Sequence, residues 1–177
     1  PPGWFARAGG RDGYRSYWER SGDGIVLLGS GVARLIRAEG TAPLRDAAAL
    51  LRADRPMLVA DALTREIGGV RYLGGFAFDP AQPAAPEWAG FPAGQLVLPR
   101  VLLHIRDGRA TLTASVPIAP GADWAAACEE TLAELAALAG ATAPSADHPA
   151  RVRAIEERPT AGAWHDVVAR TAAEVQS

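Results

Sequence analysis

The chain of 177 residues contains no lysine: all 18 of its basic residues are arginines, set against 20 acidic residues. Mechanisms that need a lysine base, a lysine Schiff base or a phosphate-loop lysine are therefore incomplete in this chain. Arginine cannot take over these roles, because its guanidinium stays protonated in proteins.

Cysteine, net charge and long apolar runs are scarce as well. Cys128 is the single cysteine, which excludes an internal disulfide framework and a zinc site built from several cysteines. The net charge of −2 gives no field that would attract nucleic acid or an anionic membrane. No apolar run reaches the roughly 20 residues that span a bilayer, and the first four residues do not form a signal pattern. We expect a soluble, cytoplasmic protein with no nucleic-acid partner and no membrane partner.

Strand patterns dominate the first two thirds of the chain. Short runs rich in apolar and aromatic residues predict strands over residues 14–18, 25–28 and 70–78. The pattern of residues 31–38 fits either a strand or a helix, and we favour the strand. A proline-rich loop is expected over residues 79–92.

The Asp107-Gly108 pair predicts the clearest hairpin, because both residue types tolerate the positive φ of a tight turn. Its two strands are expected over residues 95–105 and 109–116.

Three helices are predicted. The first is capped by Thr41, has Pro43 in its first turn and ends before Pro56. The second runs from a capping Asp123 to residue 138, and the third begins near Ala163. Their expected apolar faces are Leu44, Ala47, Ala48 and Leu51; Trp124, Cys128, Leu132, Leu135 and Leu138; and Trp164, Val167, Val168, Thr171 and Val175.

This order of elements predicts an α+β fold, an antiparallel-rich sheet with flanking helices. Residues 1–140 form the sheet-and-helix portion, and residues 141–162, rich in Ala, Pro, Ser and Arg, form a linker. Residues 163–177 form the beginning of a further portion of the protein, which follows the linker. No glycine, asparagine or proline closes the last helix before Ser177, so we expect the chain to stop in mid-element.

Gly29-Ser30-Gly31 is similar to the opening of a dinucleotide-binding loop. Arg34 stands where the third glycine of that pattern belongs, and no helix clearly opens behind it. We favour a plain turn between two strands over a nucleotide site.

The three histidines lie far apart in the sequence, so their spacing does not indicate a metal site. His104 falls in an apolar strand and is expected to be half-buried in the sheet. His148 falls in the predicted linker, and His165 falls on the polar face of the last helix.

The remaining chemistry-bearing residues favour structural roles. Cys128 shares the apolar face of its helix, which indicates an inert core thiol. Glu129, Glu130 and Glu134 are expected on the solvated flank of the same helix. No Gly-x-Ser-x-Gly elbow is present. We therefore assign no catalytic, cofactor-binding or metal-ligating residue in this chain.

The Gly74-Gly75 pair lies inside a predicted strand, where glycine weakens the structure. A bulge, a sharp bend or the close approach of another backbone requires such a pair. We favour a bent strand that packs under a helix over a ligand or second sheet lying against the pair.

Four motifs resemble the N-terminal portion of isochorismate synthases, within the chorismate-binding enzyme family that also includes anthranilate, aminodeoxychorismate and salicylate synthases. They are SYWER at residues 16–20, IVLLG at 25–29, LGGFAFDP at 73–80 and LVLPR at 96–100. Trp88 and Phe91 lie in the loop between the last two, as in isochorismate synthases. The helix with Trp164, Val167 and Val168 resembles the one that leads into the family's first catalytic strand.

The resemblance implies the N-terminal part of the chorismate-utilising enzyme fold, acting as a scaffold. In the whole enzyme, a lysine-activated water attacks C2 of chorismate while a glutamic acid protonates the departing C4 hydroxyl. Mg²⁺ holds the substrate carboxylate. The family's lysine, acid and magnesium ligands lie beyond the positions matched here, so none is transferred to this chain. The product, isochorismate, feeds menaquinone or siderophore biosynthesis.

Two alternatives remain open from the sequence. One is another chorismate-utilising enzyme, such as a salicylate synthase or an anthranilate synthase component. In anthranilate synthases, the matching region carries a feedback site for tryptophan. The other is a stand-alone module that binds a small molecule near Gly74 and Gly75.

Overall fold

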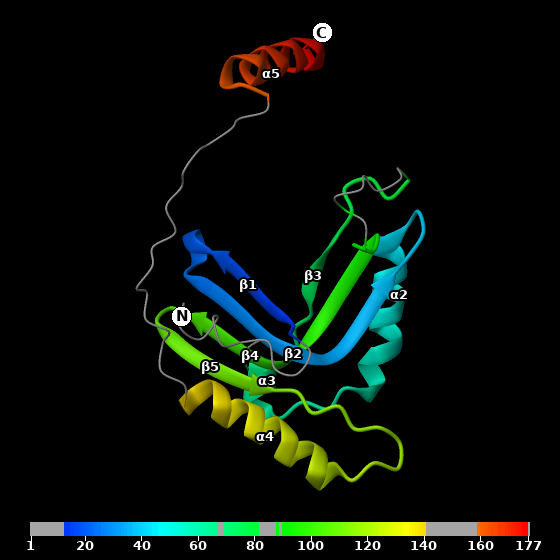
Figure 1. Cartoon of the computed structure of the whole chain (residues 1–177), viewed down its shortest axis with the longest axis vertical. Helices are drawn as coiled ribbons and strands as arrows, with labels where there is room; N and C mark the ends of the chain where they lie inside the picture. The colour runs from blue at the N-terminus through cyan, green and yellow to red at the C-terminus, as the bar shows by residue number, and fades with distance from the viewer. Residues whose placement is uncertain (1–12, 67–68, 82–87, 89, 141–158, 177) are drawn as a thin grey trace. The chain divides into compact units, whose positions relative to one another are not determined.

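The computed structural model describes residues 13–66, 69–81, 88, 90–140 and 159–176. The chain divides into two units, residues 1–144 and residues 145–177. The first unit holds a five-stranded antiparallel sheet with flanking helices, which confirms the predicted α+β class (Figure 1).

Four strands form the sheet in the order β1-β2-β4-β3, and the fifth, β5, pairs with β4. All the pairings are antiparallel. The strands are β1 (Arg15–Arg20), β2 (Ile25–Ala38), β3 (Leu73–Phe76), β4 (Gly94–Arg106) and β5 (Arg109–Ala114).

The long strands β2 and β4 run through two successive parts of the sheet. In the first part, residues 25–30 of β2 pair with β1, and residues 101–106 of β4 pair with β5. In the second part, residues 94–97 of β4 pair with β3. A bulge between Val32 and Arg34 separates the two parts, and both long strands bend sharply there (Figure 1).

The predicted turn at Gly29-Ser30-Gly31 is wrong, because these residues lie inside β2. Gly29 and Ser30 continue the pairing with both β1 and β4. Gly31 has a φ of +65°, a value that glycine adopts at little cost, and it precedes the bulge. The fully buried Pro99 pairs opposite Val32 beside the bulge, where a strand tolerates a proline.

The β4–β5 hairpin is confirmed. Asp107 and Gly108 connect the strands with φ values of 50° and 73°, as a two-residue turn with positive φ at both positions requires.

Helix α2 (Pro43–Asp54) packs against β2 and β4. It begins after Ala42 with no side-chain cap, so the predicted cap at Thr41 is wrong. Its predicted face is correct at Ala47, which is buried, and wrong at Leu44, which is 66% exposed. The short helices η2 (Arg55–Met57) and α3 (Ala62–Glu66) follow, and neither was predicted.

Helix α4 (Trp124–Gly140) packs against β4 and β5. The predicted cap is confirmed, because Asp123 Oδ1 accepts a hydrogen bond from the Ala125 amide at 2.9 Å. The face that meets the sheet is rotated from the predicted one. Thr131 and Leu138 are buried in it, whereas Trp124 and Leu132 are exposed. Leu138 and Leu135 pack against Val101 of β4.

The second unit contains α5 (Ala161–Gln176), which begins two residues before the predicted start. Every α5 residue of the predicted apolar face is exposed. Most of the predicted linker, including His148, lies outside the described residues. Within the described residues, no helix is long and apolar enough to cross a membrane.

Candidate functional site

The four motifs singled out in the sequence lie side by side in one sheet. Residues 16–20 pair with residues 25–29 across β1 and β2. Residues 26–30 of β2 pair in turn with residues 101–105 of β4, directly after the LVLPR motif. Gly74 and Gly75 of β3 pair with Leu96 and Gln95 of β4. The motifs therefore build one continuous scaffold.

The two glycines of β3 have different environments. A Cβ atom at Gly74 would overlap the backbone carbonyl of Gln95, so this position requires glycine. A Cβ atom at Gly75 would meet nothing within 4 Å. The close approach of another backbone therefore explains Gly74, and that backbone belongs to the neighbouring strand of the same sheet.

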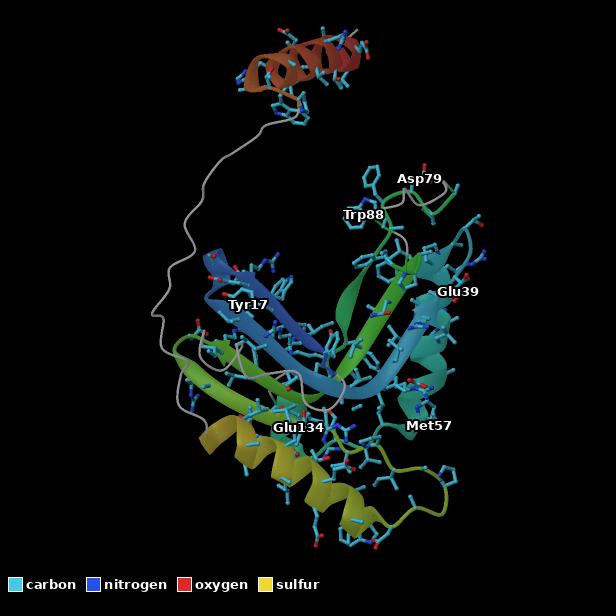
Figure 2. The ribbon with its side chains drawn as sticks, viewed as in Figure 1. Tyr17, Glu39, Met57, Asp79, Trp88 and Glu134 are labelled. Atoms are coloured by element: carbon cyan, nitrogen blue, oxygen red, sulfur yellow. The ribbon has the colours of Figure 1, made fainter. Side chains whose placement is uncertain are left out.

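Aromatic side chains gather on the segment after β3. The rings of Trp88 and Phe91 meet edge to face, with centroids 5.6 Å apart and an interplanar angle of 71°. Both rings are more than half exposed, and Phe78 is fully exposed. Figure 2 shows Trp88 beyond the end of the sheet, near Asp79. Exposed aromatic rings of this kind are frequent in binding surfaces.

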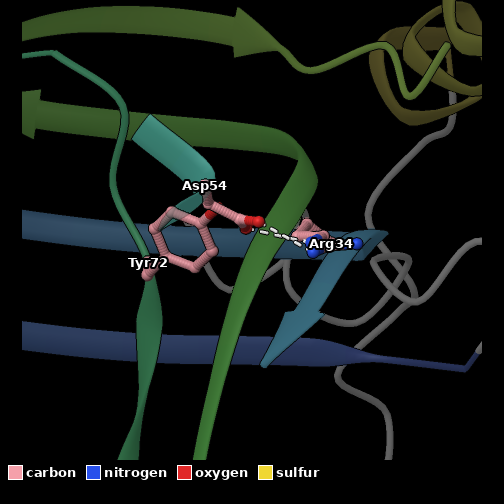
Figure 3. A network of polar contacts seen from close by, with 3 residues as sticks. All are labelled: Arg34, Asp54 and Tyr72. Atoms are coloured by element: carbon pink, nitrogen blue, oxygen red, sulfur yellow. Dashed lines mark hydrogen bonds and ion pairs between the residues drawn. The ribbon is translucent and has the colours of Figure 1, made fainter. Parts of the chain in front are cut away.

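A polar network joins β2, the end of α2 and the residue before β3 (Figure 3). Arg34 donates two hydrogen bonds to Asp54, from Nε to Oδ2 at 2.9 Å and from Nη2 to Oδ1 at 2.7 Å. The Tyr72 hydroxyl donates a third to Oδ2 at 3.2 Å. Asp54 is 5% exposed, so these three bonds satisfy a buried charge.

The network shifts the pKa values of both acidic groups. The Arg34 hydrogen bonds hold the pKa of Asp54 below its usual value, against the opposing effect of burial. Burial and the neighbouring Asp54 charge raise the pKa of Tyr72 to about 12. The network thus consists of an ionised Asp54 that accepts hydrogen bonds from Arg34 and Tyr72. These bonds link β2, the end of α2 and the residue before β3.

A second network lies between α4 and the bend of the sheet (Figure 2). Glu134 Oε2 lies 3.3 Å from Arg100 Nε, and both side chains are less than 20% exposed. Ser30 Oγ donates to Glu134 Oε1 at 3.4 Å. A Cβ atom at Gly31 would lie 2.8 Å from this same oxygen. The prediction that Glu134 lies on the solvated flank is therefore wrong; Glu129 and Glu130 are exposed as predicted.

His104 is buried more deeply than predicted, at 5% exposure. It lines a small pocket together with residues of the segment before β3 and with Thr113 of β5. Burial lowers the pKa of His104, and the positive charges of Arg71 and Arg106 lower it further. Both effects favour the neutral imidazole over its charged form.

The described part of the chain offers few side chains that could bind a magnesium ion together. Mg²⁺ prefers carboxylate and other oxygen ligands. Within the described ranges, no three His, Cys, Asp or Glu side chains gather closely enough to hold a metal ion. His165 is exposed on α5, and Cys128 is half-buried on α4. The described residues therefore do not fit a magnesium site.

The family described as chorismate binding enzyme matches residues 1–177, and no curated protein matches the chain. The chain belongs to the chorismate-binding enzyme family.

Proposed function

We propose that this chain is the N-terminal portion of an isochorismate synthase, the branch of the family that isomerises chorismate to isochorismate. One observation carries the proposal: the LGGFAFDP and LVLPR motifs, whose form resembles that branch, lie on the paired strands β3 and β4. The family match over residues 1–177 agrees with it.

In this proposal the described sheet and helices are a scaffold for chemistry performed elsewhere in the enzyme. The reaction adds water at C2 of chorismate and removes the hydroxyl at C4, which needs a general base and a general acid. The base is a lysine, which this chain lacks. A magnesium ion, when bound in the whole enzyme, neutralises the substrate carboxylate. The enzyme is cytoplasmic and supplies menaquinone or siderophore biosynthesis.

The proposal is tested on the natural gene product. Its intact mass is measured after purification from the source cells, and the purified protein is then incubated with chorismate and Mg²⁺. We expect a mass well above 18.5 kDa and the formation of isochorismate, which chelation of Mg²⁺ abolishes. The 177-residue chain alone, as the control, should give no turnover.

The other outcomes separate the alternatives. Anthranilate, formed with an added amine donor, or salicylate would assign the chain to another branch of the family. A natural product of 18.5 kDa without turnover would overturn the enzyme proposal in favour of a small-molecule-binding module.

A further inference from the structure

The Asp107-Gly108 pair forms the exposed tip of the β4–β5 hairpin. The sequence holds two further Asp-Gly pairs, at residues 12–13 and 23–24, and Asp12 lies outside the described residues. An aspartate followed by glycine can react with its own backbone, because glycine has no Cβ atom to keep its amide nitrogen away from the carboxyl carbon. The pairs at 23–24 and 107–108 therefore share one chemistry in two different surroundings.

The backbone of the Asp107-Gly108 pair lies outside the hydrogen-bonded ladder of the sheet, which ends at the Arg106–Arg109 pair. The Asp107 side chain is 76% exposed, and its Oδ2 lies 3.5 Å from Arg106 Nε; an ion pair this exposed is weak. A Cβ atom at Gly108 would meet nothing within 4 Å. Water therefore reaches both residues, and an exposed turn of this kind opens locally at little cost.

The Asp23-Gly24 pair is held more firmly, although it is also exposed. Asp23 ends the short helix η1 (Ser21–Asp23), and the Gly24 amide donates a hydrogen bond to the Ser21 carbonyl at 3.3 Å. Asp23 Oδ2 lies 3.0 Å from Arg20 Nη1. The Gly24 nitrogen must leave its hydrogen bond before it can attack a carboxyl carbon, so this turn opposes the reaction.

We propose that the hairpin tip makes Asp107 a preferred site of isoaspartate formation, ahead of Asp23. The Gly108 nitrogen attacks Cγ of the protonated Asp107 carboxyl group. The new N–C bond closes a five-membered succinimide, and the carboxyl hydroxyl leaves as water together with the amide proton.

The succinimide is then opened by water at one of its two carbonyl carbons, and the bond from that carbon to the Gly108 nitrogen breaks. Opening at Cγ restores aspartate. Opening at the main-chain carbonyl carbon of Asp107 gives isoaspartate, in which the chain runs through the side chain and the α-carboxylate is free. One water molecule leaves and one enters, so the reaction needs no other reactant.

Isoaspartate lengthens the backbone of the turn by one carbon atom. The two-residue turn fixes the register of the β4–β5 pairing, and the longer link no longer fits it. The isoaspartate form should therefore unfold at a lower urea concentration than the unreacted chain, and equal midpoints would contradict this consequence. The free α-carboxylate is a group that a carboxyl methyltransferase can esterify. This site is independent of the proposed function.

The test compares the two aspartates in the full chain during incubation for several weeks in mildly acidic buffer. Peptides that contain either residue are separated by chromatography, and electron-transfer fragmentation distinguishes isoaspartate from aspartate. We expect isoaspartate to accumulate several-fold faster at Asp107 than at Asp23. A parallel sample in guanidinium chloride, where neither turn is formed, should show similar rates at the two sites.

A matched pair of variants removes the influence of the two arginine–aspartate contacts. Asp107→Asn and Asp23→Asn form the same succinimide with loss of ammonia, so the conversion is read as a change in mass and charge. Asparagine tolerates positive φ, so both turns are kept. Asp107→Asn should convert several-fold faster than Asp23→Asn in the folded chain.

Two results would overturn the proposal. One is an equal or faster reaction at position 23 in the folded chain. The other is a preference for position 107 that persists unchanged in guanidinium chloride, because the local sequence and not the hairpin would then direct the reaction.

Discussion

The backbone carbonyl of Gln95 fills the space that a side chain at Gly74 would need, whereas the neighbouring Gly75 faces open space. The two glycines are adjacent in sequence and paired to the same strand. Only one of them is required by its surroundings.

Alanine substitutions at the two glycines should therefore have very different effects. We expect Gly74→Ala to lower the free energy of unfolding by about 3 kcal/mol, because the β3–β4 pairing must move to relieve the overlap. Gly75→Ala, as the matched control, should change it by no more than about 0.5 kcal/mol. Urea unfolding curves measure both. Equal losses would show that the pair acts through its flexibility and not through contact with Gln95.

Asp54 should contribute more to stability than an exposed aspartate in a similar ion pair. Asp54→Asn removes the negative charge and replaces one of the two acceptor oxygens by an NH₂ donor, which cannot accept from Arg34 or Tyr72. We expect a loss of about 2 kcal/mol. This figure is below that of a fully buried pair because the Arg34 side chain is 53% exposed. Asp23→Asn, which breaks the exposed pair with Arg20, should cost less than about 0.5 kcal/mol. Similar losses in the two variants would contradict the role of the buried network.

The contribution of Asp54 should depend on pH in a defined direction. The pKa of Asp54 is lowered in the folded state, so its stabilisation is complete above the pKa of an unfolded aspartate. It is lost as the pH falls through the lower folded pKa. The stability difference between wild type and Asp54→Asn should therefore be constant at neutral pH and shrink only below about pH 4. A difference that already shrinks near pH 6 would assign it to another group.

Tyr72 should be the last tyrosine to ionise as the pH is raised. Its folded pKa of about 12 exceeds the unfolded value of about 10. The neutral hydroxyl therefore stabilises the fold below pH 10, and this contribution is lost between about pH 10 and pH 12. Absorbance at 295 nm should show a late phase that Tyr72→Phe removes. The late phase should also disappear in denaturant; if it survives Tyr72→Phe, another tyrosine is responsible.

Glu134 should behave as a partner of the sheet and not as a surface residue of α4. Glu134→Gln weakens the contacts with Arg100 and Ser30, and we expect a loss of about 2 kcal/mol. Glu129→Gln, on the exposed side of the same helix, should cost less than about 0.5 kcal/mol. The Glu134→Gln, Arg100→Gln double variant should lose less than the sum of its single variants. Additive losses would show that the two side chains do not interact.

The features predicted correctly from sequence depend on a few neighbouring residues. The Asp107-Gly108 turn and the Asp123 cap involve groups within two or three positions of each other. The strands β1 and β5 and the helices α2 and α4 follow from apolar patterns of similar range. Predictions from local patterns were wrong where neighbouring segments determine the conformation of a residue. The Gly29-Ser30-Gly31 segment became the middle of β2 because strands on both sides pair with it.

The polar networks could not be predicted, because their partners are distant in the sequence. Arg34 and Asp54 are 20 positions apart, and Ser30 and Glu134 are 104 positions apart. No spacing rule links the members of either network, and the local sequence around each residue does not indicate its partner. The same applies to the pocket at His104, whose wall combines three separate segments.

By itself, the sequence determined the α+β class, the missing lysine and the motifs that place the chain in its family. These depend on composition and on runs of adjacent residues. Tertiary structure alone decided which glycine of the pair is required, which face of α4 meets the sheet and which charges are buried. Those properties depend on what another segment places against a residue, and burial and close contact exist only once the segments have packed together.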